Sequence, residues 1–509
     1  MRTKAGWHAP SRPGWAAVTT LAVVVGLMIR LNLGGSPLWL DEAQNAALTR
    51  LPLGEIGSAL EHDGHPPLFY WLLHGWTEVF GHSDRALRAL PALFGLGALV
   101  ALWFAGRRLG GSAVAWTAVA LGALSPFLVR YATEVRMYSL VTLLALVWWL
   151  VACRAREEGA LRWLVALALL TGLLVLTHYW SFFFLAAWGA AELVRWWRAG
   201  RSAVLLRPLL AVAVGSLVFL VWIGSFLAQL QHTGTPWAEA PNPAAVLTTT
   251  LFDLNGGWLE GESQALTVVM ALLLVIGFAG RRAEGTTVEL DLRGRPGVYE
   301  VTWLALGPLL IGAVAITVLD SAFASRYAAV VVGFLILIAA RGIVTLGPAM
   351  GLVALVMTSA LGAVGAWRAT DDVRSQGREV ALAVNAEHDG SGTTVVVACP
   401  DQLGPAVARY AEPGVEVLGY PTLQPADWVD WVDYAERNGR ADPATVADDL
   451  VALADGDIWL VWREGYVTYG SQCEQLRAEL EERGVTHGTA VSADTEVFEA
   501  MWLSHVVLR

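Results

Sequence analysis

Long apolar runs recur along the first 370 residues, and they constrain the fold more than any other feature of this chain. The first run, residues 15–31, is long enough to cross the ~30 Å hydrocarbon core of a bilayer as a helix that rises ~1.5 Å per residue. Ten further runs follow at 86–104, 112–129, 138–152, 161–177, 180–194, 205–227, 265–279, 303–319, 328–340 and 349–366. The hydrophobic content of 55% exceeds the ~45–50% typical of soluble domains. We therefore predict a polytopic α-helical membrane protein with about eleven transmembrane helices.

The composition changes at Asp371. From there on the chain has 25 Asp and Glu against 9 Arg, a net charge of −16, whereas the preceding residues have a net charge of +5. Short strand patterns at 394–398, 415–419, 458–462 and 506–508 alternate with helical patterns at 403–410, 443–454 and 469–483. We expect a membrane domain over residues 1–369 and a soluble α/β domain over 370–509. The acidity of the second domain disfavours a nucleic-acid partner.

Arginine clusters mark every second junction between the apolar runs, as expected for cytoplasmic loops. They are Arg107 and Arg108; Arg154, Arg156 and Arg162; Arg195, Arg198, Arg201 and Arg207; Arg281, Arg282, Arg293 and Arg295; and Arg341. The N-terminus, with Lys4 and no cleavage site, is then expected inside as part of an anchor. An odd number of crossings puts the acidic domain outside the cytoplasmic membrane. The first outer loop is 34–85, and its short apolar run 67–80 is expected to form an interfacial helix, because counting it as a span would place the arginines outside.

The acidic domain contains two of the three cysteines, Cys399 and Cys473, whereas Cys153 ends an apolar run. An oxidising compartment favours a disulfide between Cys399 and Cys473, and two free buried thiols are the alternative. The domain shows no cluster of nucleophiles or metal ligands. We expect it to shape access of the acceptor without supplying catalytic groups.

Unusual polar residues collect at the junctions predicted to lie outside. They are Asp41, Glu42, His62, Asp63, His65, Glu134, Arg136, His178, Asp320 and Arg326. Loops are often polar only because they touch water, which is the plainer interpretation of any one of them. Two features favour a site. Glu134 and Arg136 share a short loop between long apolar runs, and Arg326 lies at an outer entrance where the positive-inside bias disfavours it unless it meets an anion such as a lipid phosphate.

The order of several motifs resembles a known family. They are Leu40-Asp41-Glu42-Ala43, His65-Pro66-Pro67-Leu68-Phe69-Tyr70-Trp71-Leu72, Arg88-Ala89-Leu90-Pro91-Ala92-Leu93-Phe94-Gly95, Tyr131 through Tyr138, and Arg326-Tyr327. This set, spread over about the first 340 residues, resembles the C-type (GT-C) membrane glycosyltransferases. It is most similar to the glycosyltransferase 39 group, which includes protein O-mannosyltransferases and aminoarabinose transferases.

The resemblance implies transfer of a sugar from a polyprenyl-phosphate donor to an extracytoplasmic acceptor, with inversion at the anomeric carbon. The sugar would be mannose or a pentose such as arabinose, and the acceptor a glycan, a protein or a lipid. Asp41 would act as general base, with Glu42 as an orienting or metal-contacting neighbour. Glu134 would organise the site, and a divalent cation on Asp41, Glu42 and Glu134 is left open although none is expected to be required.

Further roles follow from the same resemblance. Arg136, Arg326 and Tyr327 would bind the donor phosphate. His65 stands where many relatives have a permanently charged residue before the Pro-Pro pair, so this chain has a titratable group there. His178 and Tyr179 would line the substrate cavity, and a histidine that caps a membrane span is the alternative for the first of them.

Two other classes of protein remain to be weighed. A transporter or flippase of lipid-linked sugars would be expected to place ionisable residues near the bilayer midplane and to show internal repeats. The charges here fall at one surface, and the chain shows no repeat. A non-catalytic scaffold would not need Asp41, Glu134 and Arg326 together.

Overall fold

The computed structural model describes residues 13–233, 242–257, 261–283, 287–293, 295–319, 321–388, 390, 393–454 and 457–508. Asp320 and Lys4, named above, lie outside these residues. Contacts divide the chain into two units. The first, the membrane unit, comprises residues 1–33, 88–223 and 240–370, and the second, the sheet unit, comprises 34–87, 224–239 and 371–509.

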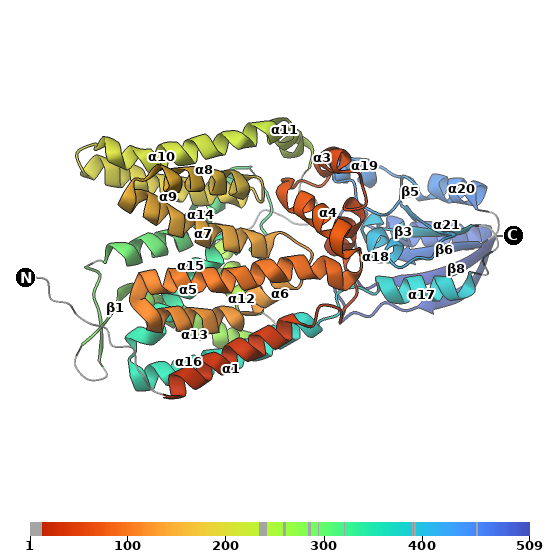
Figure 1. The fold of residues 1–509 in the computed structure, drawn as a ribbon. Coiled ribbons are helices and arrows are strands. Elements are labelled where there is room, and N and C mark those ends of the chain that lie inside the picture. The colour runs from red at the N-terminus through yellow and green to blue at the C-terminus, as the bar shows by residue number, and fades with distance from the viewer. Residues whose placement is uncertain are drawn as a thin grey trace, which may run out of the picture. The chain divides into compact units, whose positions relative to one another are not determined.

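The membrane unit is a bundle of helices (Figure 1). Its helices are α1 (Pro13–Arg30), α5 (Asp84–Ala123, whose first residues belong to the sheet unit), α6 (Pro126–Ala132), α7 (Tyr138–Glu158), α8 (Leu161–Val175), α9 (Trp180–Arg198), α10 (Ala203–Ser216), η1 (Leu217–Trp222), α12 (Pro243–Leu254), α13 (Gly261–Ala279), α14 (Pro296–Leu319), η2 (Ser325–Ala328), α15 (Ala329–Thr345) and α16 (Pro348–Asp371). A hairpin of β1 (Gly280–Arg282) and β2 (Val288–Leu290) precedes α14.

Every predicted apolar run coincides with helical segments of the described chain. Eight of the helices described are long and apolar enough to cross a membrane, so the protein is a multi-pass membrane protein. The number of crossings and their orientation stay predictions.

Two predicted runs meet in α5, which is broken at Gly110 and Gly111. Gly111 has a φ of +80°, a conformation that glycine adopts without the steric cost of a Cβ. A Cβ on Gly106 would lie 2.6 Å from the Cα of Ala115, and one on Gly122 would lie 2.6 Å from the side chain of Leu102. The two parts of α5 are therefore antiparallel helices in close contact, as the separate runs 86–104 and 112–129 predict.

The sequence did not predict α12, which lies in the stretch 228–264 that was expected to be one outer loop. The helix begins at Pro243, and the side chain of Asn242 accepts a hydrogen bond from the Ala244 N–H at 3.0 Å. An Asn before a Pro at the first helical position is a common helix start. α12 is only 12 residues long, which is too short for its sequence to indicate a membrane span.

The sheet unit contains a six-stranded mixed sheet with the strand order β5-β4-β3-β6-β8-β7. The strands are β3 (Thr394–Cys399), β4 (Val415–Gly419), β5 (Gln424–Pro425), β6 (Asp457–Trp462), β7 (Gly484–Val491) and β8 (Trp502–Leu508). β3 pairs in parallel with β4 and β6, and the outer pairs are antiparallel. The four predicted strands are confirmed, whereas β5 and β7 were not predicted.

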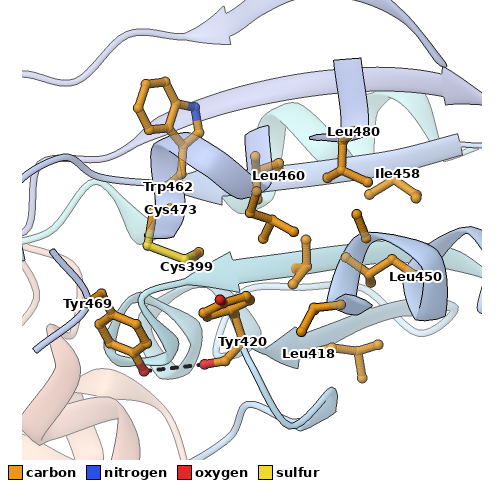
Figure 2. Close-up of a cluster of buried hydrophobic side chains, with 14 of the residues drawn as sticks. Cys399, Leu418, Tyr420, Leu450, Ile458, Leu460, Trp462, Tyr469, Cys473 and Leu480 are labelled. Atoms are coloured by element: carbon orange, nitrogen blue, oxygen red, sulfur yellow. Dashed lines mark hydrogen bonds between the residues drawn. A yellow bond between two sulfur atoms is a disulfide. The ribbon is translucent and has the colours of Figure 1, made fainter. Parts of the chain in front are cut away.

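Helices cover both faces of this sheet. α20 (Pro443–Leu453) and α21 (Gln472–Arg483) pack on one face, and α17 (Gly377–Glu387) and α18 (Gly404–Ala408) pack on the other. Figure 2 shows the first face, where Cys399 on β3 and Cys473 on α21 form a disulfide with a Cα–Cα distance of 5.4 Å. The bridge joins the central strand directly to the helix above it.

The first outer loop belongs to the sheet unit by its contacts, although the sequence grouped it with the membrane helices. It contains α2 (Leu40–Leu48), α3 (Leu53–Glu61) and α4 (Leu68–Phe80), the last being the helix predicted at 67–80. The Tyr410 hydroxyl accepts the Leu38 N–H and donates to Asp84, both at 2.7 Å. One tyrosine therefore holds both ends of the loop. Sequence patterns could not show this, because the partners are more than 300 residues apart.

Candidate active site

In the membrane unit, the loop between α6 and α7 carries Glu134 and Arg136, both of which are buried, with 4% and 3% of their surface exposed. The Arg136 N–H donates to the Glu134 carbonyl at 2.7 Å, which makes the loop tight. The Glu134 carboxylate lies 4.0 Å from the guanidinium of Arg130, one helical turn earlier on α6. Its carboxylate thus lies near one arginine side chain, and its backbone is bonded to that of a second arginine.

A row of rings links this loop to two other junctions predicted to lie outside. The Tyr138 ring lies 4.8 Å from that of Tyr131 and 5.8 Å from that of His178, and the His178 ring lies 5.5 Å from that of Tyr327. The Arg136 guanidinium lies 5.8 Å from the centre of the Tyr138 ring. The structure therefore brings together Arg136, His178 and Tyr327, which are widely separated in the sequence.

The tautomer of the neutral His178 ring is set by a hydrogen bond from Trp180. Its Nδ1 accepts the Trp180 N–H at 3.1 Å, so in the neutral ring the hydrogen resides on Nε2. His178 therefore bonds the first N–H of α9, as the capping alternative expected, and it also belongs to the row of rings. Tyr179 accepts a hydrogen bond from Trp222 at 3.0 Å, so its hydroxyl is directed toward η1.

Arg326 lies on η2, next to α12. The charges of Arg326, Arg130 and Glu134 all act on the hydroxyl group of Tyr131. Asp253 on α12 hydrogen-bonds Ser325, the residue before Arg326. Burial raises the pKa of the Asp253 carboxyl, and the bond to Ser325 and the charge of Arg130 oppose this shift. The cluster thus contains the arginines 130, 136 and 326 against the acids Glu134 and Asp253.

In the sheet unit, the first turn of α2 contains Asp41 and Glu42. The preceding Trp39 and Leu40 pack into the hydrophobic core beside β3 and β6, which anchors the start of the helix. Glu42 is buried, with 2% of its surface exposed, whereas Asp41 is partly exposed. Asp41 is therefore the more exposed of the two adjacent acids.

Asp63 organises the second part of the same loop. Its carboxylate accepts hydrogen bonds from Gln44 at 2.6 Å and from Tyr70 at 3.0 Å. Nδ1 of His65 lies 2.9 Å from the same carboxylate. A carboxylate cannot donate, so Nδ1 carries a hydrogen and the orientation of the ring is fixed. Gln44 in turn accepts the Val429 N–H at 3.1 Å, which ties this network to the sheet.

Comparison with known proteins gives a family match for part of the chain and a shared fold for nearly all of it. Residues 64–224 match the family model described as dolichyl-phosphate-mannose-protein mannosyltransferase. The fold is similar to that of ArnT from Cupriavidus metallidurans bound to undecaprenyl phosphate, with a TM-score of 0.61 and 13% identity, covering 96% of this chain and 98% of that one. The apo form of ArnT gives a TM-score of 0.59 with the same identity and coverage. This chain has the GT-C fold.

A weaker structural similarity carries no argument. Archaeal oligosaccharyltransferase AglB from Archaeoglobus fulgidus is 15% identical, with a TM-score of 0.48 over 92% of this chain and 72% of that chain. No curated protein matches in sequence.

The predicted site residues fall in both units. Glu134, Arg136, His178, Tyr179, Arg326 and Tyr327 are in the membrane unit, and Asp41, Glu42 and His65 are in the sheet unit. Within the described parts of the chain, no group of three or more His, Cys, Asp or Glu is arranged to hold a metal ion. Whether sugar transfer requires a divalent cation is tested by adding EDTA to the transfer assay.

Sequence reasoning missed three charged residues of the two candidate regions. Arg130 and Asp253 contribute to the cluster in the membrane unit, and Glu499 approaches α2 from the C-terminal segment. Arg130 directly precedes the Tyr131–Tyr138 motif, so its position was a usable signal. Nothing in the local sequence distinguishes Asp253, which lies in an unpredicted helix, or Glu499, which is one of 25 acids in the tail.

Proposed function

We propose that this GT-C enzyme transfers a sugar from a polyprenyl-phosphate donor to an acceptor hydroxyl on the outer side of the cytoplasmic membrane. The observation that carries the proposal is the arginine-rich cluster at the junctions of α6, α7 and η2, which suits a phosphate leaving group. ArnT, which has the same fold, was crystallised with undecaprenyl phosphate. The partly exposed Asp41 supports the proposal, because its motif matches the base of the family that the chain resembles.

In the proposed reaction, Asp41 takes the proton of the acceptor hydroxyl while the hydroxyl oxygen attacks the anomeric carbon of the donor sugar. The bond between the anomeric carbon and the phosphate oxygen breaks, and its electron pair stays with the polyprenyl phosphate. Arg326 and Arg136 stabilise the negative charge that develops there. Attack opposite the leaving group inverts the anomeric configuration. His65, oriented by Asp63, is assigned to substrate contacts, as is His178.

The proposal is tested with purified protein in detergent or vesicles. Polyprenyl phosphates that carry labelled mannose or labelled arabinose are offered in separate reactions, and release of polyprenyl phosphate is measured together with sugar transfer. We expect one donor to support turnover that Asp41→Asn abolishes. The matched control is Glu55→Gln, which alters an exposed carboxylate on α3 of the same loop and should leave the rate unchanged. Failure of every lipid-linked donor, with a folded protein, would contradict the proposal.

A further inference from the structure

Glu499, in the segment between β7 and β8, touches the start of α2. Its Oε1 accepts the Leu40 N–H at 2.8 Å, and Ser375 hydrogen-bonds the same carboxyl. Leu40 directly precedes Asp41, and its N–H is among the helix-start groups that have no partner within the helix. Glu499 is buried, with 5% of its surface exposed. A side chain 459 residues away along the chain thus caps the helix that carries the proposed base.

The segment that carries Glu499 is itself fixed by backbone pairing. The Glu499 N–H donates to the Arg374 carbonyl at 2.7 Å, and the Gln376 N–H donates to the Glu499 carbonyl at 3.3 Å. The Gln376 side chain accepts the N–H groups of Asp494 and Met501 at 2.9 and 3.0 Å. The contact between Glu499 and Leu40 is therefore a rigid feature and not the chance position of a loop.

The charges around Glu499 decide its protonation state. Burial raises the pKa of its carboxyl to about 8, and the negative charges of Asp41 and Glu42 act in the same direction. Among the groups that face it from other elements, Arg374 places its guanidinium 5.0 Å from the Trp39 ring, and Tyr466 and Arg463 approach from the segment after β6. Neighbouring carboxyls disfavour one another's ionisation. Burial and the two acidic neighbours therefore favour the protonated form of Glu499 at pH 7.

We propose that Glu499 is a positioning residue of the transfer reaction, which holds the first turn of α2, and with it the Asp41 carboxylate, through its hydrogen bond to the Leu40 N–H. The inference rests on the proposed function of Asp41. It gives the acidic domain a part in the reaction that goes beyond access of the acceptor, although Glu499 need not touch the substrate.

The test compares Glu499→Gln with Glu499→Ala in the transfer assay between pH 6 and 9.5. Gln keeps an oxygen that can accept the Leu40 N–H and, like the protonated acid, has no charge. We expect it to retain the wild-type rate at pH 7 within about twofold, whereas Ala lowers kcat by about tenfold with little change in the KM for donor, as loss of a buried hydrogen bond predicts. The matched control is Glu496→Ala, an exposed carboxylate of the same segment, which should behave as wild type.

The pH profile separates a positioning role from a merely structural one. The wild-type rate should fall as pH rises through about 8, because an ionised Glu499 repels Asp41 and an anionic donor, and this limb should be missing in Glu499→Gln. Wild-type kcat in Glu499→Ala, or the same alkaline limb in Glu499→Gln, would overturn the inference. If Glu499→Ala fails to fold, the comparison of wild type with Glu499→Gln still decides it. A fully active Asp41→Asn variant would instead refute the assignment of Asp41 as the base, and failure of every lipid-linked donor would refute the proposed function.

Discussion

The two charged regions of this protein are built in different ways. In the membrane unit, Glu134 is held by Arg130 on the preceding turn and by the backbone of Arg136 two residues later. In the sheet unit, α2 is held by Tyr410, which bonds Leu38, and by Glu499, which bonds Leu40. Local contacts therefore shape the loop that carries Glu134 and Arg136, whereas the acidic region depends on the folding of the C-terminal domain. Changes far from the site should accordingly disturb the acidic region more.

The largest effect that we expect, and the first test of this contrast, concerns the disulfide between Cys399 and Cys473. Replacing Cys399 and Cys473 together by serine opens a link that spans 74 residues, and the chain-entropy model predicts a loss of about 4 kcal/mol in the free energy of unfolding of the sheet unit. Chemical denaturation followed by tryptophan fluorescence measures this loss, and Cys153→Ser serves as the control. An unchanged unfolding midpoint would mean that the bridge does not support the domain that holds α2.

The next effect concerns donor binding in the membrane unit. Arg326→Ala should weaken binding of a polyprenyl-phosphate sugar by about 10- to 100-fold, the range expected for loss of a hydrogen bond to a charged group. Arg326→Lys should recover only part of it, because lysine keeps the charge but loses the two-pronged geometry. The matched control is Arg198→Ala, an exposed arginine at the end of α9. Unchanged affinity in Arg326→Ala would assign this residue to helix packing.

A smaller effect is expected for the Asp63 network. Asp63→Asn replaces one acceptor oxygen by a donor that must face Gln44 or the pair of Tyr70 and His65. A mismatched buried hydrogen bond costs about 1–3 kcal/mol. The thermal midpoint of unfolding should fall accordingly. If it does not, the three contacts are not supporting the loop, and the orientation assigned to His65 loses its basis.

Removal of divalent cations should have the smallest effect. Because the arginines 130, 136 and 326 can supply the positive charge that the departing phosphate needs, we expect transfer in excess EDTA to stay within about twofold of the untreated rate. If EDTA abolishes transfer and one particular cation restores it, this prediction is wrong. The acids of the site would then be candidate ligands of that cation.

Much of the fold could be predicted from the sequence, since apolar length alone marks membrane helices. The break at Gly110 and Gly111 was implied by the arginines before it. The membership of the first outer loop could not be predicted, because bonds such as that between Leu40 and Glu499 join residues 459 positions apart. For the same reason, the sequence does not distinguish Glu499 from the other acids of the tail. Arg136, His178 and Tyr327 could be grouped because each lies at an end of an apolar run.

Single-turnover kinetics of Asp41→Asn at saturating donor test the central claim most directly. Asn has nearly the same shape as Asp but cannot accept the acceptor's proton, so the chemical step should slow by ~10²-fold or more while donor affinity stays at the wild-type value. A normal chemical step in a folded Asp41→Asn enzyme would contradict the assignment of the base. Loss of donor affinity with an unchanged chemical step would contradict the division of roles between the acidic region and the arginine-rich cluster.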